Sequence, residues 1–182
     1  MSSKQCFAGI FLFVLSVFPD AFAQPAASPP AAAVGPVRSQ RQEIHALRLR
    51  PGQDLRVELE RFAKSAGLRA GYIITCVGSL NRATLRLANR SETTAFDGKF
   101  EIVSLVGTLT PDGPHLHLSI SDNTGRTIGG HLIEGCPIYT TAEIVIGEAT
   151  DLDFTRELDV QSGYEELAVR PRKSKKRSRA KK

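Results

Sequence analysis

The chain has 182 residues and is 41% apolar, which is enough for one domain with a hydrophobic core. Its formal net charge of +5 hides an asymmetry, because residues 170–182 carry nine basic side chains and no acidic one. Residues 24–169 carry fourteen basic and eighteen acidic side chains, a net charge of −4. Tryptophan is absent and the phenylalanines are scattered, which argues against an aromatic, basic platform on which nucleic-acid bases could stack.

Residues 1–23 have the features of a secretory signal peptide. Lys4 gives a positive start, residues 7–18 are mostly apolar, and Ala21-Phe22-Ala23 is a small-x-small cleavage site. The apolar run is too short to span a bilayer as a helix. An uncleaved anchor and a misassigned start codon are the alternatives. We expect a periplasmic or secreted protein whose mature form begins at Gln24 and has no membrane span.

Three further segments follow the signal peptide. Residues 24–40 are rich in alanine and proline and are expected to form an extended linker. Residues 41–169 form the folded domain, and residues 170–182 are expected to be a disordered basic tail. The charge of the tail predicts weak, salt-sensitive binding of DNA or another polyanion without sequence preference. The residues expected to make these contacts are Arg170, Arg172, Lys173, Lys175, Lys176 and Arg177.

The pattern of apolar residues within the domain is mainly that of β-strands. Alternating or continuous apolar runs predict strands over residues 43–50, 70–80, 83–88, 99–109 and 136–146, and residues 154–169 predict a short edge strand. A turn is expected at Asn81-Arg82, and loops are expected over 89–95 and 147–153. The domain is therefore predicted to be rich in sheet.

One helix is predicted over residues 54–66. Asp54 is a favourable N-terminal capping residue, and Leu55, Leu59 and Phe62 fall at helical spacing to form one apolar stripe. Gly67 suits the left-handed conformation that commonly ends a helix.

Three of the four histidines lie within residues 113–132. His115 and His117 are two residues apart in an alternating run, so in a strand their imidazoles share one face. The Asp122–Gly125 segment predicts a tight turn, which would bring His131 opposite or diagonal to His117. Three imidazoles with an open fourth position are typical of a zinc centre that also holds a water or a substrate. The alternative is three histidines that make unrelated hydrogen bonds on a half-buried sheet.

The remaining histidine and the cysteines are expected to be structural. His45 is interpreted as a surface or capping residue and not as a metal ligand. Cys76 and Cys136 lie in apolar strands, so buried free thiols are expected, although an oxidising compartment would also permit a disulfide.

Six segments resemble the PPC domain, which is conserved in plants and prokaryotes. They are LRLRPGQDL at 47–55, FAKSAGLRAGYIITCVGSL at 62–80, GKFEIVSLVGTL at 98–109, PHLHLSISDNTGRTIGGHL at 114–132, TTAEIVIGE at 140–148 and FTRELDVQSGYEEL at 154–167. The resemblance implies an α+β fold in which a mostly antiparallel β-sheet packs against one main helix, assembled as a homotrimer. It also implies that His115, His117 and His131 can form a metal site, as in stand-alone prokaryotic members.

Plant members of this family carry an AT-hook that binds DNA, whereas the PPC domain itself drives assembly and partner contacts. The plant contact motif corresponds here to Gly98, Lys99, Phe100, Glu101, Ile102 and Val103, with Lys and Val in place of the usual Arg and Leu. The core of an AT-hook, Arg-Gly-Arg-Pro, does not occur in the sequence. A signal peptide is also foreign to a nuclear regulator, so the plant function is not carried over.

Three classes of function follow from these features. The favoured one is an exported, trimeric binding or assembly module with a divalent metal, zinc in the first place, and room for a small-molecule ligand at the metal. The second is a metal-dependent enzyme that acts on a small molecule, which would need a nearby acid or base such as Glu101, Glu134 or Glu143. The third is a polyanion binder that acts through its basic tail.

Overall fold

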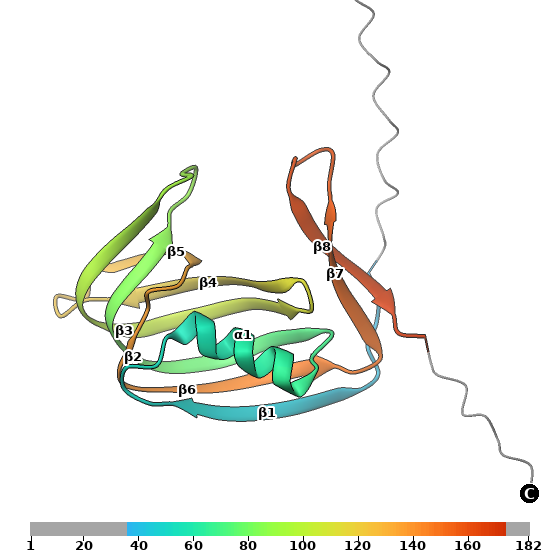
Figure 1. The fold of residues 1–182 in the computed structure, drawn as a ribbon, viewed down its shortest axis with the longest axis horizontal. Coiled ribbons are helices and arrows are strands. Elements are labelled where there is room, and N and C mark those ends of the chain that lie inside the picture. Colours follow the sequence, from blue (N-terminus) through green and yellow to red (C-terminus); the bar gives the residue numbers. More distant parts are fainter. Residues whose placement is uncertain (1–35, 174–182) are drawn as a thin grey trace, which may run out of the picture.

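The computed structural model describes residues 36–173, so the predicted signal peptide, most of the linker and most of the basic tail lie outside the described residues. The described residues form a mostly antiparallel β-structure with one α-helix, as expected (Figure 1). The elements are β1 (Gln42–Leu49), α1 (Leu55–Ala66), β2 (Gly71–Arg86), β3 (Thr93–Thr110), β4 (Gly113–Ser121), β5 (Thr127–Leu132), β6 (Ile138–Ala149), β7 (Leu152–Leu158) and β8 (Glu165–Pro171).

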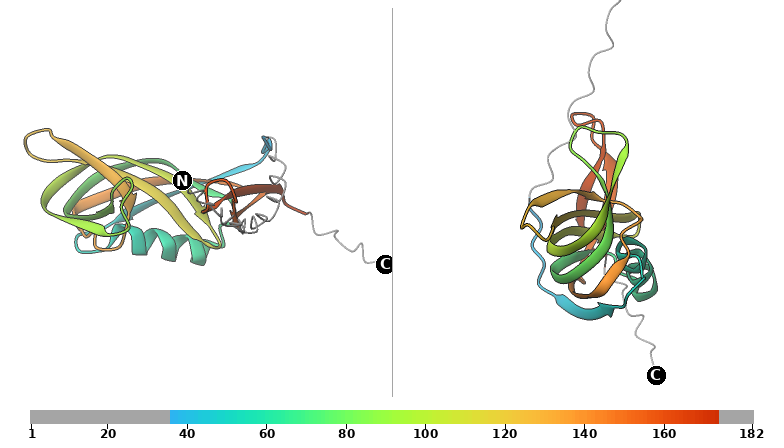
Figure 2. Two further views of the ribbon diagram at one scale, coloured as in Figure 1. Left: turned by 90° about the horizontal axis from the view of Figure 1, so that it is seen from above. Right: turned by 90° about the vertical axis from the view of Figure 1, so that its left-hand side faces the viewer.

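Six of the strands form one curled sheet. Their order is β1-β6-β2-β3-β4-β5, and β5 pairs in addition with the end of β2 through Leu85–Leu132 and Arg86–His131. This second pairing closes β2, β3, β4 and β5 into a small barrel, which Figure 2 shows end-on in its right-hand view. The β7–β8 hairpin forms a separate two-stranded sheet that projects beside the barrel (Figure 1).

The helix α1 begins where the sequence predicts. One carboxylate oxygen of Asp54 accepts hydrogen bonds from the backbone N–H groups of Arg56 and Val57, at 3.0 and 3.1 Å. The other oxygen accepts hydrogen bonds from Gly135 and Cys136 in the loop before β6, at 2.8 and 2.7 Å. This single side chain therefore both caps the helix and ties it to the sheet.

The apolar stripe of α1 packs on the inner face of the sheet. Leu55, Leu59 and Ala63 are buried there, and the core continues into the barrel. The largest fully buried side chains of the strands include Leu80, Leu85, Leu118, Ile120, Ile138, Ile144 and Ile146. The outer face of the sheet, on the side away from α1, is thereby left available for binding sites and for contacts with other molecules. The described residues include no helix with the length and apolarity that a membrane span requires.

Two strands are longer than the sequence analysis predicts. The expected turn at Asn81-Arg82 is wrong: β2 runs on to Arg86, and a shift of register between Leu80 and Arg82 bends the strand without ending it. The strand β3 begins at Thr93, inside the expected loop. These ends pair with each other, with Arg86 opposite Thr93. The alternation of residues 83–88 does carry a strand signal, whereas Thr93 and Thr94 at the start of β3 show no such alternation.

The C-terminal part of the domain also differs from the prediction. Residues 154–169 form most of a two-stranded hairpin and not one edge strand, and β6 extends to Ala149 within the expected loop. The strand β8 ends at Pro171, so the basic segment begins within a strand and not after it.

Candidate metal centre

The β4–β5 hairpin positions the histidines through its turn. One carboxylate oxygen of Asp122 accepts hydrogen bonds from the backbone N–H and the hydroxyl of Thr124, at 2.8 and 2.6 Å, and from the N–H of Arg126 at 3.1 Å. Gly125 adopts a positive φ of 82° within this turn. The resulting register makes His117 and His131 directly opposed residues, as the spacing predicts.

The three imidazoles converge on the outer face of the barrel. Their ring centroids are separated by 5.3 Å for His115–His117, 4.3 Å for His117–His131 and 5.1 Å for His115–His131. One ring nitrogen from each histidine lies within 4.8 Å of the others. The cluster predicted from the sequence is therefore present, and its donors are close enough to share one ion.

The neighbouring strand β3 supports the histidine-bearing strand from the side. Val106 is the cross-strand partner of His117, and Thr108 is that of His115. Between them, Gly107 has a φ of 135°, and a Cβ atom at this position would overlap the carbonyl oxygen of His115. The absence of a side chain at Gly107 is thus what allows β3 and β4 to approach at the metal centre.

Burial and nearby arginines favour the neutral form of two of the histidines. Burial lowers the pKa of His131 to about 4, and the positive charge of Arg86, its cross-strand partner, contributes. Burial likewise lowers the pKa of His115, with Arg156 as the next cause. Because a metal binds neutral imidazole, both groups are in the ligating form at neutral pH.

The donor set fits a divalent transition metal. Three neutral imidazoles leave at least one coordination position open, and imidazole suits zinc, copper, iron or nickel better than magnesium or calcium. A metal in this position would polarise a bound water or ligand, and the three histidines would hold it on a preformed surface.

A cavity of about 750 Å³ adjoins the centre. Besides His115 and His131 it is lined by three arginines, by an aromatic residue and by two carboxylates, namely Arg56, Arg86, Arg90, Tyr164, Glu165 and Glu166. Arg156 lies at the edge of the same region, where its guanidinium donates to the hydroxyl of Thr108 at 2.9 Å. The β7–β8 hairpin thus supplies one wall beside the histidines.

Sequence reasoning missed Arg86, Arg156 and Tyr164. Arg86 carries a usable signal, because it alternates with the apolar Leu85 and Leu87 in a run with strand character. Arg156 and Tyr164 carry none, because they reach the centre only through the packing of a hairpin that lies far along the chain.

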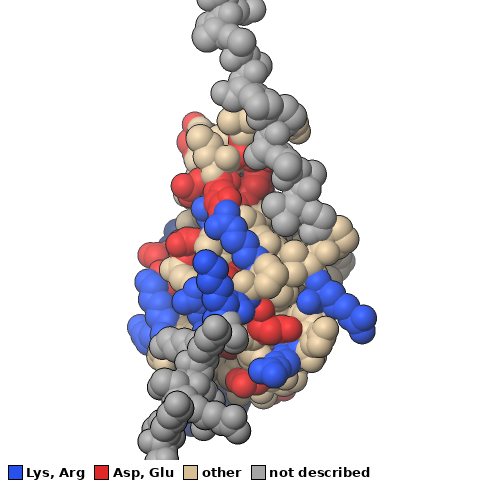
Figure 3. Space-filling model, turned by 90° about the vertical axis from the view of Figure 1, so that its right-hand side faces the viewer, with Lys and Arg blue, Asp and Glu red and all other residues tan. Residues whose placement is uncertain are grey.

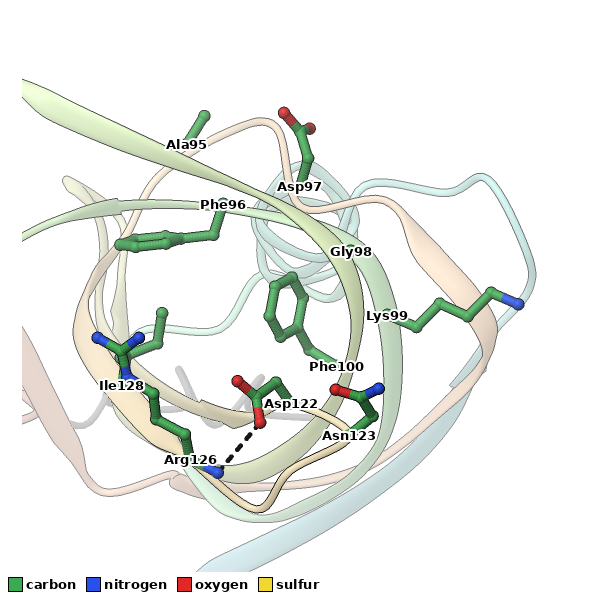
Figure 4. Close-up of a pocket in the computed structure, with 10 residues that line it drawn as sticks. All are labelled: Ala95, Phe96, Asp97, Gly98, Lys99, Phe100, Asp122, Asn123, Arg126 and Ile128. Carbon is green, nitrogen blue, oxygen red and sulfur yellow. Dashed lines mark hydrogen bonds between the residues drawn. The ribbon is translucent and has the colours of Figure 1, made fainter.

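The expected partner segment, Gly98 to Val103, lies in the first half of β3. Phe100 and Ile102 are buried in the core, whereas Lys99, Glu101 and Val103 are exposed. Figure 4 shows Phe100 directed into the barrel and Lys99 directed outward. The ammonium group of Lys99 lies 4.4 Å from the ring centroid of Tyr139. The residues of the segment that a partner could reach are therefore the exposed Gly98, Lys99, Glu101 and Val103.

A second cavity, of about 740 Å³, lies at this end of the barrel. It is lined by Gly98, Lys99 and Phe100 and by the β4–β5 turn with Asp122 and Arg126 (Figure 4). The hairpin thus contributes its turn to this cavity and its paired histidines to the metal centre.

The described part of the basic segment is largely paired with acidic groups. Arg170 lies 2.7 Å from Glu157, and Arg172 lies 3.8 Å from Asp153. Lys173 is exposed, and Lys175, Lys176 and Arg177 lie outside the described residues. In Figure 3, acidic side chains gather on the upper part of this face and basic ones below, so the face is of mixed charge.

Cys76 and Cys136, the two cysteines among the described residues, are buried free thiols. Burial raises the pKa of Cys76 to about 12 and that of Cys136 to about 11, so both remain protonated near neutral pH. Neither has the lowered pKa of a catalytic thiol.

Three relatives place this architecture among known proteins. A 149-residue segment is 48% identical to the bifunctional protein GlmU of Synechococcus sp. strain JA-3-3Ab, covering 80% of this chain but only 24% of that protein. A hypothetical protein of Salmonella enterica is 44% identical, with a TM-score of 0.73, and the match covers 75% of this chain and 98% of that one. The metal-containing protein of Archaeoglobus fulgidus shares the fold at 24% identity and a TM-score of 0.55, over 72% of this chain and 95% of that one.

A family model gives the assignment directly. The model of the Plants and Prokaryotes Conserved (PCC) domain matches residues 37–150, which contain the helix, the six-stranded sheet and the three histidines. The sequence resemblance to the PPC domain is thereby confirmed, and the chain belongs to the Plants and Prokaryotes Conserved domain family.

Proposed function

We propose that this chain is an exported, homotrimeric binding module in which His115, His117 and His131 hold one divalent metal, zinc in the first place. The observation that carries the proposal is the convergence of three imidazole donors within 4.8 Å on paired strands. The lowered pKa values of His115 and His131 favour the ligating form, which supports metal uptake at neutral pH. The fold shared with a protein described as metal-containing is consistent with this role.

Exposed apolar side chains on the outer face of the sheet support self-association. We call them the outer patch: Ile74, Val77, Val103, Val106 and Tyr139, which are between 39% and 56% exposed. They belong to β2, β3 and β6, the middle strands of the sheet, where a soluble monomer would be expected to place polar residues. Val106 pairs with His117, so the outer patch reaches the metal centre. Association of three copies through this patch would bury it.

The cavity beside the histidines supports a small anionic ligand at the metal. Arg86 and Arg90 line it together with His115 and His131. A carboxylate or phosphate group could occupy the open coordination position while it accepts hydrogen bonds from a guanidinium. The protein would then recognise a ligand jointly through metal and arginine.

Binding is the activity that these groups support best. None of Glu101, Glu134 and Glu143, the candidates for an acid or base, is among the residues that line this cavity. The carboxylates that do line it are Glu165 and Glu166, and the hydroxyl of Ser162 donates a hydrogen bond to Glu166 at 3.0 Å.

Export is supported by the N-terminal sequence alone. The positive residue Lys4, the apolar run and the Ala21-Phe22-Ala23 site make up a complete signal. Mass spectrometry of protein from its native host should find a mature form that begins at Gln24, and recovery of an intact Met1 form from the cytoplasm would exclude export.

The central experiment measures metal and mass on the same sample. Purified mature protein is dialysed against Zn²⁺, its metal content is measured by elemental analysis, and its molar mass by light scattering. We expect the wild type to bind zinc and to have the molar mass of a trimer. The His117→Ala variant should lose the zinc. A clean monomer would overturn the assembly, and unchanged metal in His117→Ala would overturn the centre.

A second candidate function, weak polyanion binding, rests on the basic tail. Because Arg170 and Arg172 are paired with acidic groups in the described structure, the contacts would begin at about Lys173. The affinity of the full chain for a DNA duplex should fall steeply with salt. Removal of residues 174–182 should abolish this binding. A sequence-specific footprint that survives high salt would contradict this role.

A further inference from the structure

A second group of metal-ligand side chains lies on the inner face of the sheet, near the C-terminal end of α1. Glu43 and His45 are two residues apart on β1, so their side chains share one face. His45 pairs with the fully buried Ile146 of β6, which identifies that face as the inner one. Figure 1 shows β1 and β6 side by side at the lower edge of the sheet, with α1 in front.

Glu148 joins these two residues from the neighbouring strand. It is the direct cross-strand partner of Glu43 and lies two residues beyond Ile146, on the same face. One oxygen or nitrogen from each of Glu43, His45 and Glu148 lies within 4.8 Å of the others. Its donor atoms thus lie within the same 4.8 Å limit as those of the three histidines on the outer face.

The burial of this group leaves its polar atoms incompletely satisfied. Nε2 of His45 is buried and has no hydrogen-bond partner in the described structure. Glu148 is only 6% exposed, and one of its oxygens accepts a hydrogen bond from the backbone N–H of Arg69 at 3.0 Å. The guanidinium of Arg69 is engaged with Asp153 at 2.6 Å. A buried nitrogen without a partner is unfavourable unless a further group binds it.

We propose that Glu43, His45 and Glu148 form a second divalent-metal site. A cation between the three would give Nε2 of His45 the partner that it lacks and would bind the neighbouring carboxylate of Glu148. One imidazole and two carboxylates suit Zn²⁺ and similar first-row ions.

The surroundings of the site have the features of a support for metal ligands. The ring of Phe62 packs edge-on against the imidazole of His45, with centroids 5.5 Å apart, and so fixes its orientation. The N–H of Arg69 orients the carboxylate of Glu148. Glu43 is exposed, which leaves a path for the ion from solvent. This proposal gives His45 a ligand role, whereas the sequence favours a surface or capping histidine.

The test is made in a chain from which the first centre has been removed. The His117→Ala/His131→Ala variant is dialysed against Zn²⁺, and about one ion per chain should remain bound. Adding His45→Gln should abolish this retention, and adding Glu148→Gln should do the same. Glu143→Gln is the matched control, because this exposed glutamate lies on β6 but on the outer face. It should leave the retained zinc unchanged.

A spectroscopic measurement distinguishes metal binding to the His45 ring from protonation of that ring. In the His117→Ala/His131→Ala variant, the ¹⁵N resonances of the His45 ring should shift on addition of Zn²⁺ and recover with a chelator. Absence of retained zinc, equal retention after His45→Gln, or a His45 ring that is protonated and insensitive to Zn²⁺ would each overturn the proposal. Because half-buried His45 can be changed without altering the core, His45→Gln decides the question even if Glu148→Gln does not fold. The outcome is independent of whether the three-histidine centre binds metal.

Discussion

His117 and His131 oppose each other directly across the β4–β5 hairpin, with ring centroids 4.3 Å apart. Their register depends on the turn, in which Asp122 binds the N–H groups of Thr124 and Arg126. A slip of one residue would place the two imidazoles on opposite faces of the sheet. The three-histidine cluster is therefore a product of hairpin register, and substitutions that affect metal binding should act through that register or through the donors themselves.

The first prediction concerns a donor. His117→Ala should remove the metal from the three-histidine centre, because two imidazoles on a flat strand face leave the ion with too few protein ligands. Ser119→Ala is the control, since Ser119 lies two residues further along the same face of β4 and offers no imidazole. Elemental analysis after dialysis measures the difference. Equal metal content in His117→Ala and in the wild type would mean that the histidines are structural.

The second prediction concerns pH. The pKa of His131 is lowered from 6.5 to about 4 by burial and by Arg86, so the unfolded chain binds more protons than the folded one between these values. Stability is then complete above the unfolded pKa and is lost as the pH falls through about 6.5 towards about 4. Thermal unfolding of metal-free protein should show this slope, and His131→Gln should flatten it. An unchanged slope in that variant would assign the proton uptake to other groups.

The same shift changes the expectation for metal occupancy. The reference pKa of histidine predicts loss of metal as the pH drops through roughly 6. Because the pKa values of His115 and His131 are lowered, these two imidazoles stay neutral further into the acid range, and their own protonation should contribute to metal loss only at lower pH.

The third prediction concerns Gly107. Gly107→Ala places a Cβ atom against the carbonyl oxygen of His115 and forces a positive φ on a residue with a side chain. We expect a loss of roughly 2–4 kcal/mol in the free energy of unfolding and a weaker metal centre. Gly113→Ala shares the positive φ but meets no atom within 4 Å, and should lose only about 1 kcal/mol. Denaturant unfolding compares the two, and equal losses would contradict a steric role of Gly107.

The fourth prediction concerns assembly. Val77→Glu and Val103→Glu place charges in the outer patch, where each valine is 56% exposed in the monomer. If this patch is buried between copies, either change should shift the molar mass from trimer to monomer, because an unpaired charge would be desolvated. Val160→Glu changes an exposed valine in the loop between β7 and β8 and should leave the mass unchanged. Light scattering reports the result, and a persistent trimer in both patch variants would move the interface elsewhere.

The fifth prediction concerns the cap of α1. Asp54→Ala leaves the N–H groups of Arg56 and Val57 without their acceptor, and also those of Gly135 and Cys136. We expect a loss of about 2–4 kcal/mol in the free energy of unfolding, more than a helix cap alone contributes. The free energy of unfolding of Asp54→Ala is compared with that of Gln53→Ala, which changes the residue one position before. A loss of about 1 kcal/mol or less would show that the loop contacts add little.

The sequence predicted those elements of the structure that are determined by residues close together in the chain. Helix α1 was expected from its cap and its stripe, and the hairpin with His117 and His131 from its turn, and both are present. The family pattern supported the same sheet and helix.

The features that the sequence did not predict have a common physical origin, which is pairing between strands that are distant in the chain. The continuity of β2 past Arg82 depends on its pairing with β3, which no local pattern encodes. The approach of Arg156 to His115 and of Glu148 to His45 likewise depends on strands that are distant in sequence. Residue types with useful chemistry are visible along the chain, but their grouping is set by the curl and register of the sheet.

The strand β5 is hydrogen-bonded on both sides, to β4 along its length and to the end of β2 through Leu132 and His131. The strand that carries His131 is therefore held in place on both sides whether or not a metal is bound. An ion that arrives at this surface has little chain to order, so most of its interaction energy is retained as affinity. Treatment with a chelator should consequently return a protein that keeps its shape and rebinds zinc at once, in contrast to the zinc modules that unfold when the metal is withdrawn.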